Sequence, residues 1–293
     1  QDFHRFILTD KIDSVRVITI RRPQAMNALN DEVTGEILDV LQKDEDNPDI
    51  NGFIITGYGT QAFSAGADIG KFPEMLGDKA ASVQYAKDCA TVQRHMDCMA
   101  KPVVAALNGL AMGGGLEVAI RCHSLVAVKN ATLQFPEIGL GILPGIGGCV
   151  VPYRKWPQGA SLFNDMILLG KPIKTQDAAD IGMVDQLVDN PADLMATAIA
   201  EIDRIRNNIP RITEQAVDLP EFVIPDHPMA GKQALSMEAV TITAETVKKG
   251  AGASSLQQAL EIGYNGFGRI ACCDAATEGI SAFLEKRRPN FTK

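Results

Sequence analysis

The sequence predicts an α/β protein whose C-terminal part is all-helical. Two observations predict this fold class. Short strands rich in β-branched residues alternate with helical patterns up to about residue 190, and four longer helical patterns follow. Alternating strands and helices imply a parallel sheet with crossover helices. We therefore expect an α/β core over residues 1–190 and a helical part over residues 191–293.

The first expected strand covers residues 14–20, where apolar and polar residues alternate. Asn30 and Asp31 then offer an N-cap for a helix whose apolar residues recur at helical spacing. The same criteria predict the remaining strands of the core at 52–57, 103–106, 124–128, 132–135 and 186–188. They predict its remaining helices at 79–99, 116–121, 160–169 and 177–181.

The C-terminal part is expected to contain four helices, at residues 192–207, 232–249, 255–270 and 274–286. The stretch 210–230 between the first two carries four prolines, at positions 210, 220, 225 and 228. Proline removes a backbone donor and clashes with the preceding helical turn, so this stretch is too rich in proline for a helix.

Composition excludes some classes of function. The net charge of -8 and the aromatic content of 5% argue against a nucleic-acid partner, which needs a basic surface and stacking side chains. The six cysteines show no CxxC spacing and lie mostly in apolar runs, which favours a reduced cytosolic compartment. No apolar run reaches the roughly eighteen residues of a membrane span. We expect a soluble cytoplasmic protein without a membrane partner.

A triple glycine at residues 113–115 is the most distinctive local feature of the chain. The loops after the strands at 52–57 and 103–106 should emerge at the carboxyl ends of parallel strands, where open α/β sheets place their sites. Each loop leads through small residues into a helix, which leaves the backbone N–H groups of Ala67 and Gly114 free to donate. Two such donors aimed at one point would form an oxyanion hole for a thioester or ketone oxygen.

Two carboxylates accompany these glycines. Glu117 lies one turn into the helix that the glycines open, and Glu137 follows Pro136. Apolar neighbours would raise the pKa of a carboxyl by desolvation, which suits it to proton transfer near neutral pH. The alternative is that both are solvated glutamates placed at helix starts by the helix dipole. The residue pattern alone leaves both interpretations open.

Two other signals do not lead to a site. The glycines at 145–148 lack the full G-x-G-x-x-G pattern after a strand, so a dinucleotide site is not expected. The four histidines are scattered, and His123 beside Cys122 is interpreted as packing, so no metal site is expected.

Five stretches, in order along nearly the whole chain, resemble the enoyl-CoA hydratase/isomerase, or crotonase, family. They are residues 22–29 (RPQAMNAL), 63–71 (FSAGADIGK), 106–117, 135–148 and 267–288. The resemblance implies a crotonase-like spiral of ββα units whose helices assemble a homotrimer or a dimer of trimers. It also implies an acyl-CoA thioester as substrate, with CoA as part of the substrate and no separate cofactor.

The resemblance further implies a catalytic arrangement. The thioester carbonyl oxygen would lie between the amides of Ala67 and Gly114. Hydratases of the family use two glutamates and many relatives keep one, so the presence of both favours a hydro-lyase of fatty acid β-oxidation that adds water to a trans-2-enoyl-CoA. On this interpretation Glu117 deprotonates the water that attacks C3, and Glu137 delivers a proton to C2.

The resemblance also implies a set of residues along which the acyl-CoA would lie. These are Gln24, Ala25, Met26, Ala28, Ala65, Asp68, Ile69, Gly70, Lys71, Phe283 and Lys286. Two of them depart from the family pattern, because Gln24 and Gly70 stand where basic residues are usual. Both departures remove cationic partners for phosphate, so we expect weaker or shifted CoA binding unless Lys71 compensates.

Other interpretations remain open at this point. An enoyl-CoA isomerase would work with a single glutamate, and a non-catalytic crotonase-like binding protein would need neither. The proline-rich stretch at 210–230 resembles an insertion, interpreted as a surface loop because long insertions cost little, with a contact to a partner domain as the alternative. Gln1 in place of an initiating Met motivates a further hypothesis, in which the chain is fused to or associated with a 3-hydroxyacyl-CoA dehydrogenase.

Overall fold

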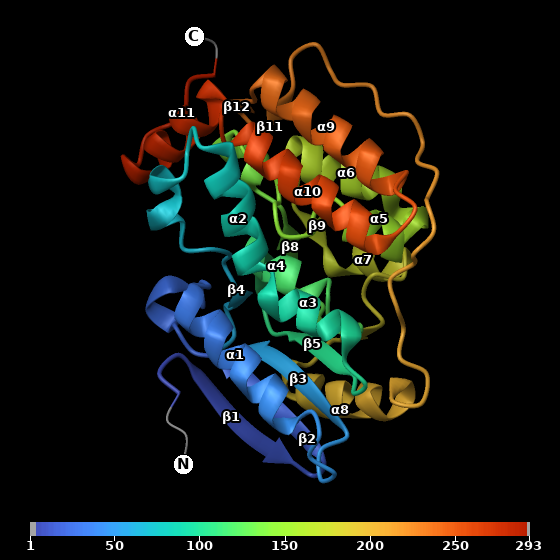
Figure 1. The fold of residues 1–293 in the computed structure, drawn as a ribbon. Helices are drawn as coiled ribbons and strands as arrows, with labels where there is room; N and C mark the ends of the chain where they lie inside the picture. Colours follow the sequence, from blue (N-terminus) through green and yellow to red (C-terminus); the bar gives the residue numbers. More distant parts are fainter. Residues whose placement is uncertain (1–3, 292–293) are drawn as a thin grey trace. The chain divides into compact units, whose positions relative to one another are not determined.

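A computed structural model describes residues 4–291, so Gln1 lies outside the described residues. The chain forms two compact units that interleave along the sequence (Figure 1). The first unit comprises the residues up to 67 together with 91–133 and 173–211. The second comprises 68–90, 134–172 and the residues from 212 onward. The predicted domain boundary near residue 190 stays a prediction.

The first unit is built on a six-stranded sheet in the order β1-β2-β3-β5-β7-β10. All neighbouring strands are parallel except β1, which pairs antiparallel with β2. The strands are β1 (Ile7–Ile12), β2 (Val15–Ile20), β3 (Gly52–Gly57), β5 (Val103–Leu107), β7 (Ser124–Val128) and β10 (Gln186–Val188). The predicted parallel sheet is therefore confirmed, and β1 is an edge strand that the sequence analysis missed.

A second, four-stranded sheet has the order β4-β6-β8-β9. Its strands are β4 (Ala62–Ser64), β6 (Leu110–Met112), β8 (Thr132–Gln134) and β9 (Ile173–Lys174). Each of β3, β5 and β7 is followed along the chain by one strand of this second sheet, in the same spatial order. This repetition is the expected spiral of ββα units. Strands of two or three residues are too short to show alternation, which is why β4, β6 and β9 were not predicted.

The helices of the first unit are α1 (Asp31–Asp44), α3 (Thr91–Cys98), α4 (Gly114–Ala119), α7 (Thr175–Asp180) and α8 (Leu194–Ile205). The predicted N-cap is confirmed, because the side chain of Asn30 accepts a hydrogen bond from Val33 N at 2.9 Å. The single helix predicted over 79–99 is wrong. Ala90 adopts φ -89° and ψ 10°, which ends α2 (Lys79–Cys89) before α3 begins, and no Gly or Pro marks this break.

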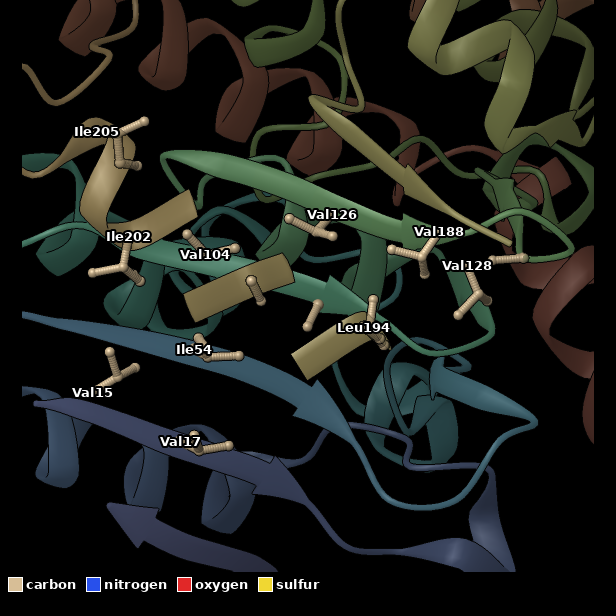
Figure 2. Packing of buried hydrophobic residues seen from close by; sticks show 13 residues of the cluster. Val15, Val17, Ile54, Val104, Val126, Val128, Val188, Leu194, Ile202 and Ile205 are labelled. Carbon is tan, nitrogen blue, oxygen red and sulfur yellow. The ribbon is translucent and has the colours of Figure 1, made fainter. Parts of the chain in front are cut away.

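The core of the first unit lies between its large sheet and α8. Figure 2 shows strand residues such as Ile54, Val104 and Val126 directed at Leu194 and Ile202 of the helix. All of these side chains are at least 94% buried. Burying a side chain of this size stabilises the fold by roughly 1.5–3 kcal/mol, so α8 holds the sheet in place.

The second unit is mostly helical. Its helices are α2, α5 (Val151–Lys155), α6 (Ala160–Leu169), α9 (Met237–Ala251), α10 (Leu256–Ile270) and α11 (Asp274–Leu284). Its 3-10 helices include η2 (Ile69–Glu74), η3 (Glu137–Leu140) and η4 (Pro157–Gly159), and β11 (Met229–Ala230) pairs with β12 (Gln233–Ala234). Helix α10 packs against α2 and α9, and α11 packs against η2 and η3. Within residues 4–291, no helix is long and apolar enough to cross a membrane.

The proline-rich stretch contains no helix, as predicted, and its first part is attached to its own unit. The buried guanidinium of Arg154 donates to the carbonyl oxygens of Thr213 at 2.9 Å and Gln215 at 3.0 Å. The Glu214 carboxylate accepts from Leu256 N at 2.6 Å. These bonds hold the start of the stretch against α5 and α10.

A buried carboxylate joins α8 to the sheet of the first unit. Ser124 Oγ, at the start of β7, lies 2.6 Å from both Glu201 Oε1 and Asp185 Oδ2. Arg204, one turn further along α8, pairs with the same Glu201. Burial raises the pKa of Glu201, but the hydrogen bonds from Arg204 and Ser124 outweigh burial and hold this pKa below its usual value.

Glu201→Gln is therefore expected to lower the free energy of unfolding by about 1–2 kcal/mol near neutral pH, a modest figure because Arg204 is half exposed and screened. Because the folded-state pKa is depressed, this stabilisation is present above the unfolded carboxyl pKa and is lost as the pH falls through the folded value. Urea unfolding at several pH values tests this, with the exposed Glu221→Gln as control. A gap between wild type and Glu201→Gln that stays constant into acid would contradict it.

Candidate active site

Pairing of β4 with β6 brings together the two loops that the sequence analysis singled out. The two strands run parallel, with Ala62 opposite Leu110, and Leu110 N donates to Gln61 O at 3.0 Å. Asn108 reinforces the pairing, because its Nδ2 donates to the carbonyl oxygens of Gly59 at 2.8 Å and Ala62 at 3.1 Å. The segments that follow β4 and β6 therefore leave the sheet side by side.

The backbone amides of Ala67 and Gly114 lie close together at the end of these loops. A Cβ built on Gly114 would stand 3.4 Å from Ala67 N, and a Cβ on Gly66 would stand 3.5 Å from Gly114 N. Within residues 4–291, neither amide donates to another group of the chain. Gly114 is also the first residue of α4, where the helix leaves its N–H groups unused. The predicted pair of donors is thus brought together.

Glycine is required where the two loops touch. Gly66 has φ +101° and Gly113 has φ +51°, which L side chains rarely adopt. A Cβ at Gly115 would stand 2.5 Å from Ser64 Cβ and 2.8 Å from Ser64 O. The triple glycine lets α4 start against the neighbouring loop, and this close approach sets the distance between the two amides.

Glu117 lies in the first turn of α4, as predicted, and only 3% of its surface is exposed. Its backbone N–H donates to Gly113 O at 2.9 Å. The interpretation of Glu117 as a solvated helix-start glutamate is therefore wrong. The same helix thus carries this buried carboxylate and presents the Gly114 amide.

A third loop of the first unit carries Gln24, Ala25, Met26 and Ala28, at and just after η1 (Pro23–Ala25). Met26 O accepts from Ala65 N at 3.0 Å, and Leu29 N donates to Gly66 O at 2.8 Å. This loop therefore lies along the Ala65–Ala67 loop, and the structure brings these predicted residues together.

The sequence analysis missed Asn27, which positions this loop. Its side chain is buried, accepts from Arg22 N at 3.1 Å and donates to the carbonyl oxygens of Tyr58 at 3.0 Å and Ala62 at 2.8 Å. Its φ of +57° is one that asparagine tolerates better than most residues. The sequence offered one signal for this role, which is an asparagine between residues predicted to bind the substrate.

Glu137 belongs to the second unit, where it begins η3 and is 9% exposed. It too is buried, so the solvated interpretation fails for this residue as well. Its unit also holds Asp68, Ile69, Gly70 and Lys71 at η2, and Phe283 and Lys286 at the end of α11. Because α11 packs against both η2 and η3, these predicted residues lie on neighbouring elements.

Two neighbouring cationic residues, Lys286 and Arg287, follow α11. Lys286 follows α11 with φ +55°, and its backbone N–H donates to Phe283 O at 3.1 Å. The adjacent Arg287 is held by Glu278 at 2.6 Å and by Glu285 at 2.5 Å. The guanidinium of Arg287 is therefore already paired with two nearby carboxylates. Among residues 4–291, no group of three or more His, Cys, Asp or Glu could hold a metal ion.

Comparison with known proteins establishes the class that this fold and these loops define. The sequence model of the enoyl-CoA hydratase/isomerase family matches residues 10–221. The match covers well over half of the chain, so the chain belongs to this family.

Individual relatives are consistent with the family. A short-chain-enoyl-CoA hydratase of Clostridium acetobutylicum is 35% identical over 72% of this chain and 80% of its own length. A crotonyl-CoA hydratase of Syntrophomonas wolfei is 32% identical over 97% of both chains. Among solved structures, a carnitinyl-CoA hydratase of Mycobacterium avium superposes with a TM-score of 0.69 at 25% identity, covering 98% of both chains.

Gly115→Ala is expected to force apart α4 and the Ser64 backbone, which would lower stability by about 1–3 kcal/mol. The substitution would also displace the Gly114 amide. A reaction that uses this amide should then slow by about 10²-fold, because misplacing a catalytic group by roughly 1 Å lowers the rate by that factor. Gly35→Ala is the matched control, because nothing lies within 4 Å of its Cβ position in α1 and it should stabilise by about 0.5–1 kcal/mol. Equal effects of the two substitutions on melting would refute the close approach.

Proposed function

We propose that this protein is an enoyl-CoA hydratase that adds water across the double bond of a trans-2-enoyl-CoA to give a 3-hydroxyacyl-CoA. The observation that carries the proposal is the paired amides of Ala67 and Gly114, with the buried Glu117 in the same first turn of α4. Relatives named as hydratases of short enoyl-CoA esters support it.

The paired amides would act on the thioester carbonyl. When water attacks C3, negative charge moves through C2 to the carbonyl oxygen, forming an enolate. Two N–H donors fixed before the reaction stabilise that charge without reorganising, and removing one such donor typically costs about 2.7–4 kcal/mol. The positive end of α4 adds to the same stabilisation.

The two glutamates would move the protons. In our proposal Glu117 takes a proton from the attacking water, and Glu137 gives a proton to C2 as the enolate collapses. The net change is the addition of one water, with no electron gained or lost. The chemistry therefore needs no redox cofactor, and we propose that CoA enters only as part of the substrate.

The CoA part of the substrate would lie along two groups of residues. The first is the Gln24–Ala28 loop with Ala65, and the second is η2 with Phe283 of α11 and Lys286 just after it. Gln24 and Gly70 supply no charge, which leaves Lys71 and Lys286 as the proposed phosphate partners.

We propose a cytoplasmic homotrimer or dimer of trimers as the assembly, by analogy with the family. Fusion to or association with a 3-hydroxyacyl-CoA dehydrogenase is a further proposal, because that activity would consume the product. Neither proposal bears on the chemistry of the site.

Glu117→Gln is expected to reduce hydration of crotonyl-CoA by about 10²–10⁴-fold, the range of general acid–base catalysis, with little change in KM. Glu137→Gln is expected to do the same. The measurement is loss of the enoyl-thioester absorbance, and Glu32→Gln, exposed at the start of α1, is the control.

Three results would contradict this assignment. A loss of only a few-fold for Glu137→Gln would remove its role as proton donor. A Glu117→Gln enzyme that still shifts the double bond of a 3-enoyl-CoA at the wild-type rate would favour the isomerase alternative. Absence of turnover on any enoyl-CoA, with CoA esters still bound, would favour a binding protein.

Lys71→Met and Lys286→Met are each expected to raise KM for crotonyl-CoA by about tenfold while leaving kcat nearly unchanged, because a charge-assisted bond to phosphate binds substrate and transition state alike. Lys129→Met, in an exposed pair with Asp189 on the first unit, is the control. A fall in kcat without a rise in KM would place these lysines outside the CoA phosphate contacts.

A further inference from the structure

A two-stranded hairpin of the second unit lies at the end of the proline-rich stretch and takes no part in the mechanism proposed above. Its strands β11 (Met229–Ala230) and β12 (Gln233–Ala234) are joined by a two-residue turn that begins with Gly231. Gly231 has φ +59°, and tight hairpin turns need such a left-handed residue at their first position. The local sequence thus favours the hairpin.

The base of the hairpin is buried. Pro228 and Leu235 lie in the interior on either side of it, and Leu235 N donates to Pro228 O at 2.9 Å. The next residue, Ser236, caps α9, because its side chain accepts from Ala239 N at 3.2 Å. The hairpin is therefore attached directly to a helix of 15 residues and is not a free loop.

Gln233 of β12 connects the hairpin to η3, the turn that begins with Glu137. Its Nε2 donates to the carbonyl oxygen of Gly139 at 2.8 Å. Gly139 lies two residues after Glu137 within the same 3-10 helix, and both partners in the bond are partly buried. The hairpin thus contacts the element that carries one of the two proposed catalytic carboxylates.

The other strand of the hairpin reaches the same turn through Gly170, at the end of α6. A Cβ built on Gly170 would stand 3.7 Å from Ala230 Cβ of β11 and 3.2 Å from Ile138 Cγ2 of η3. Gly170 O also accepts from Gln134 Nε2 at 2.8 Å, shortly before the chain enters η3. Both strands of the hairpin therefore bear on the segment around Glu137.

A single turn of 3-10 helix depends on such external contacts, because its hydrogen bonds are few and poorly aligned. At the end of η3, α11 supplies one contact, since a Cβ on Gly279 would stand 2.1 Å from Leu140 O. Gln233 supplies another at Gly139, which is nearer to Glu137 along the chain. The orientation of the turn, and with it the direction of the Glu137 side chain, therefore depends on the hairpin as well as on α11.

Resting on the proposed role of Glu137 as proton donor, we propose that Gln233 is a positioning residue for hydration. Its hydrogen bond to Gly139 holds η3 in the orientation from which Glu137 reaches C2 of the substrate. Gln233 acts through Glu137 and not on the substrate. A catalytic group misplaced by roughly 1 Å lowers the rate by about 10²-fold, so the hold on this turn matters for turnover.

Gln233→Glu is the most direct test, because glutamate has the same shape but places an oxygen where the amide donates to Gly139 O. It should lower kcat for crotonyl-CoA hydration by about tenfold or more, with KM nearly unchanged because no proposed CoA contact is altered. Gln233→Met removes the donor without adding charge, and it should lower kcat in the same way but less. Gln257→Glu, exposed in the first turn of α10, adds the same charge elsewhere and should change neither constant.

A second comparison separates positioning from a purely structural role. In a Glu137→Gln background, Gln233→Glu should lower kcat by less than about twofold, because Gln233 acts only through the carboxylate already removed. An equal loss in both backgrounds would overturn the inference. So would a Gln233→Glu protein that melts at lower temperature with kcat intact, since the bond would then serve stability alone.

Amide hydrogen exchange tests the hold on η3 without any substrate. Gly139 N donates to Pro136 O at 3.0 Å and Gly141 N donates to Ile138 O at 3.1 Å. Both amides should exchange about tenfold faster in Gln233→Glu than in the wild type, because the turn opens more readily. Unchanged exchange would overturn the inference. Failure of the wild type to hydrate crotonyl-CoA, with exchange accelerated in the variant, would refute the proposed function and leave the hold of Gln233 on η3 standing.

Discussion

The parallel pairing of β4 with β6 is the constraint on which the candidate site of the first unit depends. Three residues of β4 and three of β6 fix the direction in which the loops before Ala67 and Gly114 leave the small sheet. The carbonyl oxygen of Ala62 receives hydrogen bonds from both Asn27 and Asn108, so two further loops are attached at the same point. A short strand pair thereby holds these four loops in register.

Glycine at position 115 allows the two amides of the candidate site to approach each other. Because Gly115 has no Cβ, α4 begins in contact with the backbone of Ser64, and the Gly114 amide comes within reach of the Ala67 amide. The same helix buries Glu117 one turn later, so donor and carboxylate move as one rigid element. This explains why a helix of only six residues suffices: its rigidity comes from the packing around it and not from its length.

The second unit presents its own candidate residues on elements that pack together. Helix α11 contacts both η2 and η3, so Lys71, Lys286 and Glu137 are carried by neighbouring segments although more than 200 residues separate the first from the second. The proline-rich stretch belongs to this unit for most of its length, and its attachment through Arg154 and Glu214 favours a structural role for its first part over a free loop.

The sequence by itself determined the class of fold, most helices and strands, and the elements that carry Ala67, Gly114 and Glu117, because periodicity, caps and glycines act over a few residues. It did not reveal β1, β4, β6 and β9, whose pairing is decided by distant partners, nor the break at Ala90 between two helices of different units. Only the tertiary structure decided that Glu117 and Glu137 are buried, that Asn27 and Asn108 meet at Ala62, and that the buried Gln93 amide has no partner among residues 4–291. The physical reason is that burial and hydrogen-bond satisfaction depend on contacts between residues far apart along the chain.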